Sequence, residues 1–424
     1  MPHQVALTLA GHVRQGEVDS LRQLLETMGD GVANGAVVDL GALDGVHFAR
    51  FVLLEEVTDL RGERIPATLL YMSDLDVSRE QHLRDLVERG ADGIDRLFGH
   101  CEGYPEGAQR TNEQRLAYLL RHRIKEQAFY VNTIGRTTRQ ICEEAELRDR
   151  LEDVLDQTDG LRDQDPVEAR RALQKHVAGD PSLGWALKPP AGLELRFRLR
   201  ELAHMVGMPL LLLLLSPLLL LTAPIFAFLL RRHERSDPAP HVKPPPELVQ
   251  ELAALEDHLV QNPFSAIGFV KPGLFRRITI TTVLVALDYV TRHVFNNGNL
   301  SGVKTIHFAR WVVLDDWRRV IFASNYDGSL ESYMDDFIDK IAWGLNAAFG
   351  SGYGFPRTRW LIHDGAKDEL AFKDFLRLHQ APTRVWYSAY GRLTNANIAN
   401  NASIRAGLRG ELGPDDARKW VQAL

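Results

Sequence analysis

The hydrophobic and polar positions of this chain change period several times, and each period predicts a different element. Residues 5–9 alternate between apolar and polar side chains, which predicts a β-strand, whereas residues 18–28 place apolar side chains at helical spacing. Two β-rich runs at 46–54 and 67–72 follow, and residues 80–97 again have helical spacing. The first part of the chain therefore predicts the element order β-α-β-β-α.

The same pattern returns near the end of the chain with many of the same residues. Residues 46–56 read VHFARFVLLEE, and residues 306–316 read IHFARWVVLDD. Residues 73–105 align with 324–356 without a gap, and both segments end in a Gly-aromatic-Pro tripeptide. A repeat of about 140 residues has the size of a domain and not of a solenoid unit. We infer two copies of one module in this chain.

The second copy predicts the same elements as the first. Its strands are expected at 278–282, 306–314 and 319–324, with one helix reaching residue 293 and another over 330–349. A later helix and strand are expected to close each copy, the strands lying at 128–133 and 384–389. Short antiparallel strands crossed by two helices predict a ferredoxin-like layer with one uncovered sheet face. The fold class is therefore α+β, with two ferredoxin-like repeats packed face to face as an intramolecular pseudo-dimeric α+β barrel.

An uncharged, leucine-rich run at 208–230 lies between the two copies and is long enough to cross about 30 Å of hydrocarbon as a helix. Arginines flank both ends, so the positive-inside rule gives no single-pass orientation. Three prolines within the run favour a bend. Two alternatives stay open, a re-entrant or shallow hairpin anchor and one kinked spanning helix. The repeats favour the anchor, because modules that pack together must share one side of the membrane.

These observations divide the chain into five segments. We expect a first α+β repeat at 1–142, a helical linker at 143–200, a membrane segment at 201–235, a proline-rich linker and helix at 236–275, and a second α+β repeat at 276–424.

The net charge argues against nucleic acid as a partner, and the cysteines indicate a reducing compartment. With 45% hydrophobic and 25% charged residues, the 424-residue chain is of ordinary globular composition. A net charge of −6 gives no basic footprint, so we expect no nucleic-acid partner. The two cysteines, Cys101 and Cys142, have no zinc spacing and predict reduced thiols. The first residues do not resemble a signal peptide.

Two histidine–arginine pairs are the main candidates for chemistry. His47 lies three residues before Arg50, and His307 lies three residues before Arg310. Side chains alternate along a strand, so each histidine and its arginine are expected on opposite sheet faces, one of them buried under helices. The histidines could be axial haem ligands or general acid–base catalysts, or they could be hydrogen-bonded core residues.

Further candidate ligand-binding residues follow the next strands and the aromatic runs. Asp76, Asn325 and Asp327 lie where a strand ends and a helix begins, so they could be helix caps or buried partners for Arg50 and Arg310. The aromatic candidates for lining a cavity between the sheets are Trp311, Trp386 and Tyr387.

Several motifs of the second copy resemble an uncharacterised family of bacterial membrane-associated proteins. They are His307-Phe308-Ala309-Arg310-Trp311, Ser324-Asn325-Tyr326-Asp327-Gly328-Ser329, Gly354-Phe355-Pro356-Arg357-Thr358 and Trp386-Tyr387-Ser388-Ala389-Tyr390. The architecture is more distantly similar to the dimeric α+β barrels, which include dye-decolourising peroxidases and chlorite dismutases. The second resemblance implies haem with a histidine ligand, although the leading glycine of the peroxidases' Gly-x-x-Asp-Gly pattern is missing before Asp327.

Three functions follow as alternatives. The first is a membrane-anchored protein at the bacterial inner membrane, with both modules facing the cytoplasm, that binds a hydrophobic small ligand, lipid-derived or haem, between the modules. The second is a haem-dependent peroxidase-like oxidoreductase, in which His307 or His47 holds the iron. The third is a non-catalytic membrane scaffold whose interior is filled by side chains. The partners expected are membrane lipid and, as a possibility, a hydrophobic small molecule.

Overall fold

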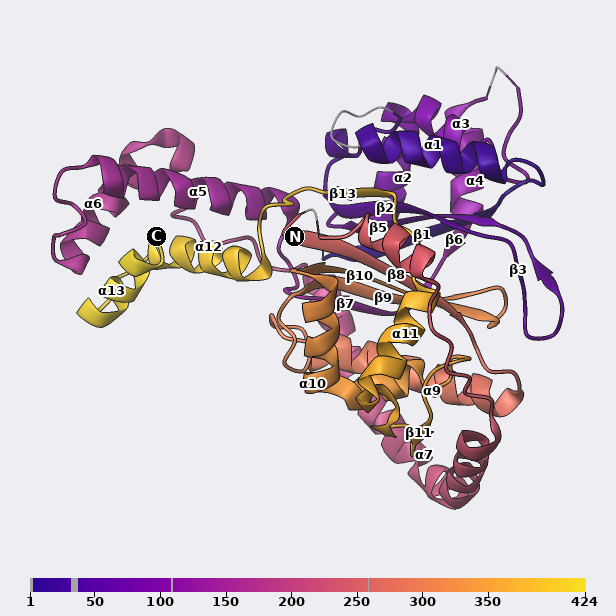
Figure 1. The fold of residues 1–424 in the computed structure, drawn as a ribbon. Coiled ribbons are helices and arrows are strands. Elements are labelled where there is room, and N and C mark those ends of the chain that lie inside the picture. The colour runs from indigo at the N-terminus through magenta and orange to yellow at the C-terminus, as the bar shows by residue number, and fades with distance from the viewer. Residues whose placement is uncertain (1–2, 32–36, 108–109, 258) are drawn as a thin grey trace.

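The computed structural model of the protein describes residues 3–31, 37–107, 110–257 and 259–424. Figure 1 shows a mixed α+β fold in which two open β-sheets stack face to face, with helices on their outer faces. A helical arm extends to one side of the stack, and a long apolar helix lies at the lower end. The α+β class predicted from the sequence is confirmed at this level.

The first sheet has five antiparallel strands in the order β13-β2-β5-β1-β6. They are β13 (Val385–Ser388), β2 (Val46–Leu54), β5 (Thr68–Leu75), β1 (Val5–His12) and β6 (Arg123–Ile124). The helices on its outer face are α1 (Val18–Gly31), α2 (Arg79–Arg89), α3 (Ala91–Phe98) and α4 (Asn112–Arg121). Their apolar stripes, including Leu21, Leu25, Leu83 and Leu86, form one core with the sheet. A short hairpin of β3 (Val57–Thr58) and β4 (Arg64–Ile65) connects β2 to β5.

The second sheet has four antiparallel strands in the order β7-β9-β10-β8. They are β7 (Glu126–Val131), β9 (Ile306–Leu314), β10 (Arg319–Asp327) and β8 (Gln261–Phe269). The helices on its outer face are α9 (Leu274–His293), α10 (Leu330–Phe349) and α11 (Glu369–His379). A short pair, β11 (Thr358–Arg359) and β12 (His363–Asp364), precedes α11, and α8 (Pro246–Ala253) precedes β8.

One edge strand of each sheet comes from the other half of the chain. β13 pairs with β2, placing Val385 opposite Phe51, and β7 pairs with β9, placing Phe129 opposite Arg310. The sequence predicted that these strands each close their own half, and that prediction is wrong. Local alternation identifies a strand but not its partner, because β2 and β9 both offer an unpaired edge. The two halves are therefore interlocked.

The strand predicted at 278–282 is also wrong, because this segment lies within helix α9. The β-branched run misled the prediction. In the structure the hydroxyls of Thr279, Thr281 and Thr282 each donate to the carbonyl four residues earlier, at 2.7–2.9 Å, which accommodates them in a helix. The first strand of the second half is β8, in a segment that the sequence had assigned to the linker.

The helical arm combines the middle of the chain with its C-terminus. It consists of α5 (Thr138–Gln157), α6 (Pro166–Gly179), α12 (Asn395–Gly407) and α13 (Pro414–Gln422). Leu147, Leu151, Leu173, Ile404 and Trp420 belong to a separate core within the arm. Helix α6 and most of α5 lie in the segment that was expected to be a helical linker, and the C-terminal segment packs on them (Figure 1).

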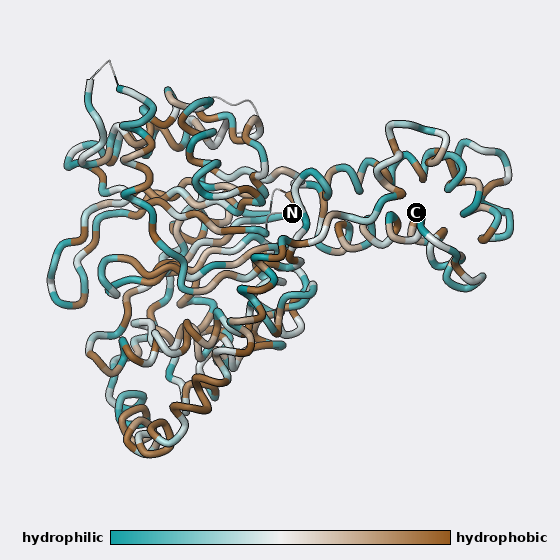
Figure 2. The backbone as a smooth tube through the Cα atoms, turned by 180° about the vertical axis from the view of Figure 1, so that it is seen from behind, coloured by the Kyte–Doolittle hydropathy of each residue, from teal (hydrophilic) through white to brown (hydrophobic). Residues whose placement is uncertain are grey.

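Helix α7 (Leu195–Ser236) contains the whole apolar run with its three prolines. Its most apolar window is 0% buried, and among the described residues it is the one helix long and apolar enough to cross a membrane, by length and composition. Figure 2 shows it as a hydrophobic tip at the lower end of the molecule.

Both ends of α7 contact the same helix, α9. Near its start, Glu201 accepts hydrogen bonds from Arg292 of α9 at 2.6 and 3.0 Å, and at its end Asp237 accepts one from Arg276 at 2.8 Å. These contacts lie about 24 Å apart along α9, whereas the intervening length of α7 would measure about 54 Å as a straight helix. α7 therefore bends away from α9 and returns to it.

The prolines of α7 leave carbonyl groups without helical partners, and hydroxyl groups satisfy two of them. Pro209 has no N–H for the carbonyl of Met205, which accepts a hydrogen bond from the Tyr289 hydroxyl at 3.1 Å. Pro217 likewise frees the carbonyl four residues before it, and the Ser216 hydroxyl donates to that oxygen at 2.7 Å. The bent helix thus limits the exposure of unpaired backbone groups to an apolar surrounding.

The space between the two sheets is filled by side chains. Val52, Leu70 and Met72 of the first sheet and Val312 and Ile321 of the second belong to one buried cluster. This cluster occupies the region where the sequence predicted a possible ligand cavity.

A buried histidine in the first outer core gives a pH-dependent prediction. His82 lies against Tyr71, with 2.8 Å between Nε2 and the hydroxyl oxygen, and burial lowers the pKa of His82 from 6.5 to about 4. The unfolded chain then binds more protons than the fold between pH 6.5 and 4, so stability falls as the pH falls through this window. We expect a loss of roughly 3 kcal/mol of unfolding free energy from this residue.

The measurement is chemical denaturation of wild type and His82→Phe at pH 7 and pH 4.5. The phenylalanine variant should show a smaller loss on acidification. Tyr71→Phe is the control, because it removes the hydroxyl but keeps the imidazole and should keep the full pH dependence. Equal acid sensitivity in wild type and His82→Phe would contradict the assignment.

Candidate functional site

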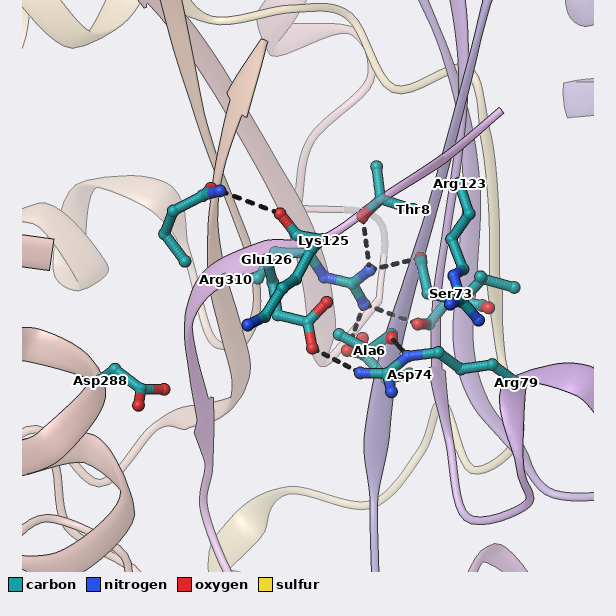
Figure 3. A network of polar contacts seen from close by, with 12 residues as sticks. Ala6, Thr8, Ser73, Asp74, Arg79, Arg123, Lys125, Glu126, Asp288 and Arg310 are labelled. Atoms are coloured by element: carbon teal, nitrogen blue, oxygen red, sulfur yellow. Dashed lines mark hydrogen bonds and ion pairs between the residues drawn. The ribbon is translucent and has the colours of Figure 1, made fainter. Parts of the chain in front are cut away.

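The centre of the sheet–sheet interface holds a buried arginine from each sheet that reaches into the other. Arg310 of β9 donates to the carbonyls of Leu7 and Ser73 in the first sheet, at 2.7 and 2.8 Å, and forms an ion pair with Asp74 (Figure 3). Its side chain is 3% exposed, and that of Asp74 is 4% exposed. The guanidinium group therefore donates to two neighbouring strands of the opposite sheet, β1 and β5.

Arg50 of β2 makes the reciprocal contacts with the second sheet. It donates to the carbonyls of Phe264 and Ser324, at 2.8 and 2.7 Å, and to the side-chain oxygen of Asn325. Asn325 in turn donates to Asp74 at 2.9 Å, which joins the two sets of contacts. Burial lowers the pKa of Arg50 to about 9, so the side chain remains charged at neutral pH.

β-Bulges at His47 and His307 turn both histidines toward the opposite sheet. The pairing register shifts at each of these two positions, leaving the histidine as an additional residue. The His47 ring lies 5.1 Å from the Phe308 ring, and the His307 ring lies 5.4 Å from the Phe48 ring. The prediction that each histidine and its arginine face opposite sides, one of them under helices, is therefore wrong.

Each histidine pairs with an aspartate at the end of the neighbouring strand. His307 Nε2 lies 2.6 Å from Asp327 Oδ1, and His47 Nε2 lies 3.4 Å from Asp76 Oδ2. The Nδ1 atom of His47 lies 2.8 Å from the Tyr390 hydroxyl. Binding of Arg50 and Arg310 by Asp76 and Asp327 was one of the two alternatives that the sequence left open, and the structure does not show it. The bulges place the histidines next to these aspartates instead.

The same aspartates hold the first residues of two arm helices. Asp76 accepts the backbone N–H of Thr138 at 2.6 Å, at the start of α5, and Asp327 accepts that of Asn395 at 2.8 Å, at the start of α12. Burial alone would raise the pKa of Asp76, but the neighbouring His47 and the hydrogen bonds from Thr138 outweigh burial and lower the pKa. A carboxylate at a helix N-terminus is favoured by the orphan N–H groups there. These side chains fix the arm to the sheets.

The cavity beside the histidines is too small for a cofactor. It measures about 20 Å³, room for about one water molecule. Among the described residues, no group of three or more His, Cys, Asp and Glu side chains could hold a metal ion. The residues do not fit a haem group, and the catalytic roles considered for His47 and His307 gain no support from this geometry.

Of the three aromatic candidates, one reaches the arginine network. The Trp386 indole donates to Asn325 at 3.0 Å and stacks on Phe48 with ring centroids 6.0 Å apart. Trp311 lies in the outer core of the second sheet, and Tyr387 packs against the outer core of the first. The three therefore do not line one common cavity.

A larger cavity, of about 730 Å³, lies at the side of the sheet stack. We call it the anchor cleft, because it is lined by β6, β7, α9 and the first turns of α7. Sequence reasoning missed it. The only local signal is the aromatic and basic sequence Phe197 to Arg200 before the apolar run, and nothing in that signal connects it with β6 or α9.

Comparisons with known proteins do not identify a relative. No family model matches the chain, no curated protein matches it, and no solved structure matches it. The family resemblance and the barrel architecture therefore remain predictions.

The arginine network predicts an order of stabilities among three variants. Arg310→Ala leaves the Asp74 carboxylate buried without its cation and should cost about 3–5 kcal/mol. Arg50→Ala leaves a neutral amide and should cost less, about 2 kcal/mol. Adding Asp74→Asn to Arg310→Ala should recover at least about 1 kcal/mol, because it removes the orphaned charge.

Denaturation midpoints of the full chain in detergent measure this order. Equal losses of stability in Arg310→Ala and Arg50→Ala would contradict the prediction. So would a further loss of stability when Asp74→Asn is added to Arg310→Ala, because the unpaired Asp74 carboxylate would then not be the cause of the larger loss.

Proposed function

We propose that this chain is a membrane-anchored protein that binds a hydrophobic small molecule between its two halves. Its bent helix α7 dips into one leaflet from the cytoplasmic face of the bacterial inner membrane, and the two sheets stay in the aqueous phase. The observation that carries the proposal is the return of α7 to α9, because both ends of the exposed apolar segment contact the same helix on the outer face of the second sheet.

The flanking charges support a one-sided anchor. Arg196, Arg198 and Arg200 precede the apolar run, and Arg231 and Arg232 follow it. Lysine and arginine mark cytoplasmic ends of membrane helices, so both ends carry the same mark. A bent path with both ends on one side accommodates this pattern, whereas a single crossing would leave one basic end on the wrong side.

We further infer that the halves are two ferredoxin-like repeats forming an intramolecular pseudo-dimer of the α+β barrel type. The reciprocal reach of Arg50 and Arg310, the paired bulges and the exchange of β7 and β13 support it. Each of these three features of one half has a counterpart in the other.

The position of the ligand site differs from the one expected from the sequence. The sheet interface is packed, and the cavity beside the histidines is small, which weighs against a ligand in the centre. The anchor cleft has walls from both halves, β6 and β7 from the first and α9 from the second, and its volume is within the usual range for small-molecule sites. It is the site that we propose.

Cysteine labelling tests the anchor. In a Cys142→Ser background, which leaves only the buried Cys101, single cysteines replace Arg198, Arg232 or Leu214. We expect a membrane-impermeant maleimide to label the Arg198→Cys and Arg232→Cys proteins in inside-out vesicles but not in spheroplasts. Leu214→Cys, in the apolar segment, should react in neither because lipid covers it.

Labelling of Arg198→Cys and Arg232→Cys from opposite sides would establish a spanning helix and contradict the one-sided anchor. Release of the wild-type protein from membranes by a high-salt wash would contradict insertion altogether.

A further inference from the structure

The anchor cleft has an apolar wall that continues toward the anchor. Phe129, Ile134, Phe197, Leu284 and Val285 contribute to its lining. Phe197 stands on α7 itself, where its ring stacks on His3 at 4.0 Å between centroids. A cavity with this wall beside an exposed apolar helix suits a ligand that has an apolar part of its own.

Most charged groups around the cleft are already paired with each other. Arg79 binds Glu126, as Figure 3 shows, and Arg292 is held by Glu201 and Asp288. Internally paired charges offer little net attraction to a ligand, so the remaining charges decide what the cleft can bind.

Two cations of the lining remain without a full partner. Within the described ranges, no carboxylate lies at ion-pair distance from Lys125, which sits between β6 and β7 (Figure 3). Arg200 on α7 has one 3.4 Å contact with Glu201, whose oxygens already accept bonds from Arg292. The body and the anchor thus each bring one available positive charge to the same cavity, which suits an anionic group.

The position of Arg200 along α7 determines how far its charge lies from the apolar run. It lies eight residues before Met208, where the uncharged run begins, or about 12 Å along a helix. If the apolar run lies in the hydrocarbon, as proposed above, Arg200 is at the level of the lipid headgroups, where basic side chains meet anionic lipids.

We propose that the anchor cleft binds one anionic phospholipid. Its phosphate group lies at Lys125 and Arg200, and its acyl part lies on the apolar wall toward α7. This inference rests on the proposed function and specifies its ligand. A free phosphate ion shares the headgroup chemistry but would leave the apolar wall unfilled, so the two sources can be separated by experiment.

The test uses the full chain, purified in detergent and stripped of lipid, with native mass spectrometry as the readout. The probes are phosphatidylglycerol, zwitterionic phosphatidylcholine and inorganic phosphate. At about a factor of five for each available cation, phosphatidylglycerol should bind about 30-fold more tightly than phosphatidylcholine. Inorganic phosphate should not displace it. The variant Lys125→Gln/Arg200→Gln should lose the preference for the anionic lipid.

Two further variants separate the cleft from general surface charge. Arg232→Gln/Lys304→Gln also removes two exposed cations, neither of which lines the cleft, and should keep the preference. Val285→Trp replaces a 47% exposed residue of the cleft wall without changing charge, and should reduce specific binding by filling the cavity.

Equal binding of the two lipids by wild type, or a preference unchanged in Lys125→Gln/Arg200→Gln, would overturn the proposal. Displacement of phosphatidylglycerol by inorganic phosphate at similar concentration would make the cleft a site for a soluble anion instead. Cell fractionation distinguishes these outcomes from failure of the anchor. The Lys125→Gln/Arg200→Gln variant should stay in the membrane fraction although its lipid preference is lost. A wild-type protein found in the soluble fraction would contradict the anchor, but the lipid preference measured in detergent would still stand.

Discussion

Two guanidinium groups buried between the sheets are the constraint on which this fold depends. A buried charge is costly unless its hydrogen bonds are made, and Arg50 and Arg310 each make them with carbonyls of the opposite sheet. Each arginine can do so only if the two sheets face each other in one register. Asp74 and Asn325 meet at 2.9 Å between these arginines. Two carboxylates at that distance could not both be ionised, which explains why one position carries an amide.

The sequence was sufficient to predict the strands that carry these arginines but not the surroundings of the histidines. Side chains alternate along β2, so Arg50 shares a face with Val52 and Leu54, and in the structure Val52 and Leu54 lie in the cluster between the sheets. One additional residue in a strand makes every side chain before it point to the opposite face of the sheet. No local residue type marks such a bulge at His47. The pairing of the histidines with Asp76 and Asp327 follows from that bulge, so it could not be derived from spacing alone.

Longer-range features were hidden for a different reason. The segment at 278–285 has the composition of a strand, yet in α9 the buried Ile280 and Leu284 pack into the outer core of the second sheet. Tertiary burial outweighs a β-propensity that is worth at most about 1 kcal/mol per residue. The exchange of β7 and β13, and the anchor cleft that β7 helps to line, depend on which edges meet after folding. Among these longer features, the apolar run at 208–230 could be identified from the sequence, because its length and lack of charge are local properties.

Helix α9 connects the apolar helix α7 to the two sheets. One side of it packs under the second sheet and against β7, which comes from the first half, and it also receives both ends of α7. A straight α7 could not keep both contacts, because it is about twice as long as the distance between them. Arg276 is 1% exposed and bound to Asp237, so releasing that end of α7 would leave a buried charge without its partner. The bend of the apolar helix and the folding of α9 therefore stabilise each other, and the shape of the cleft between α9 and β7 depends on both.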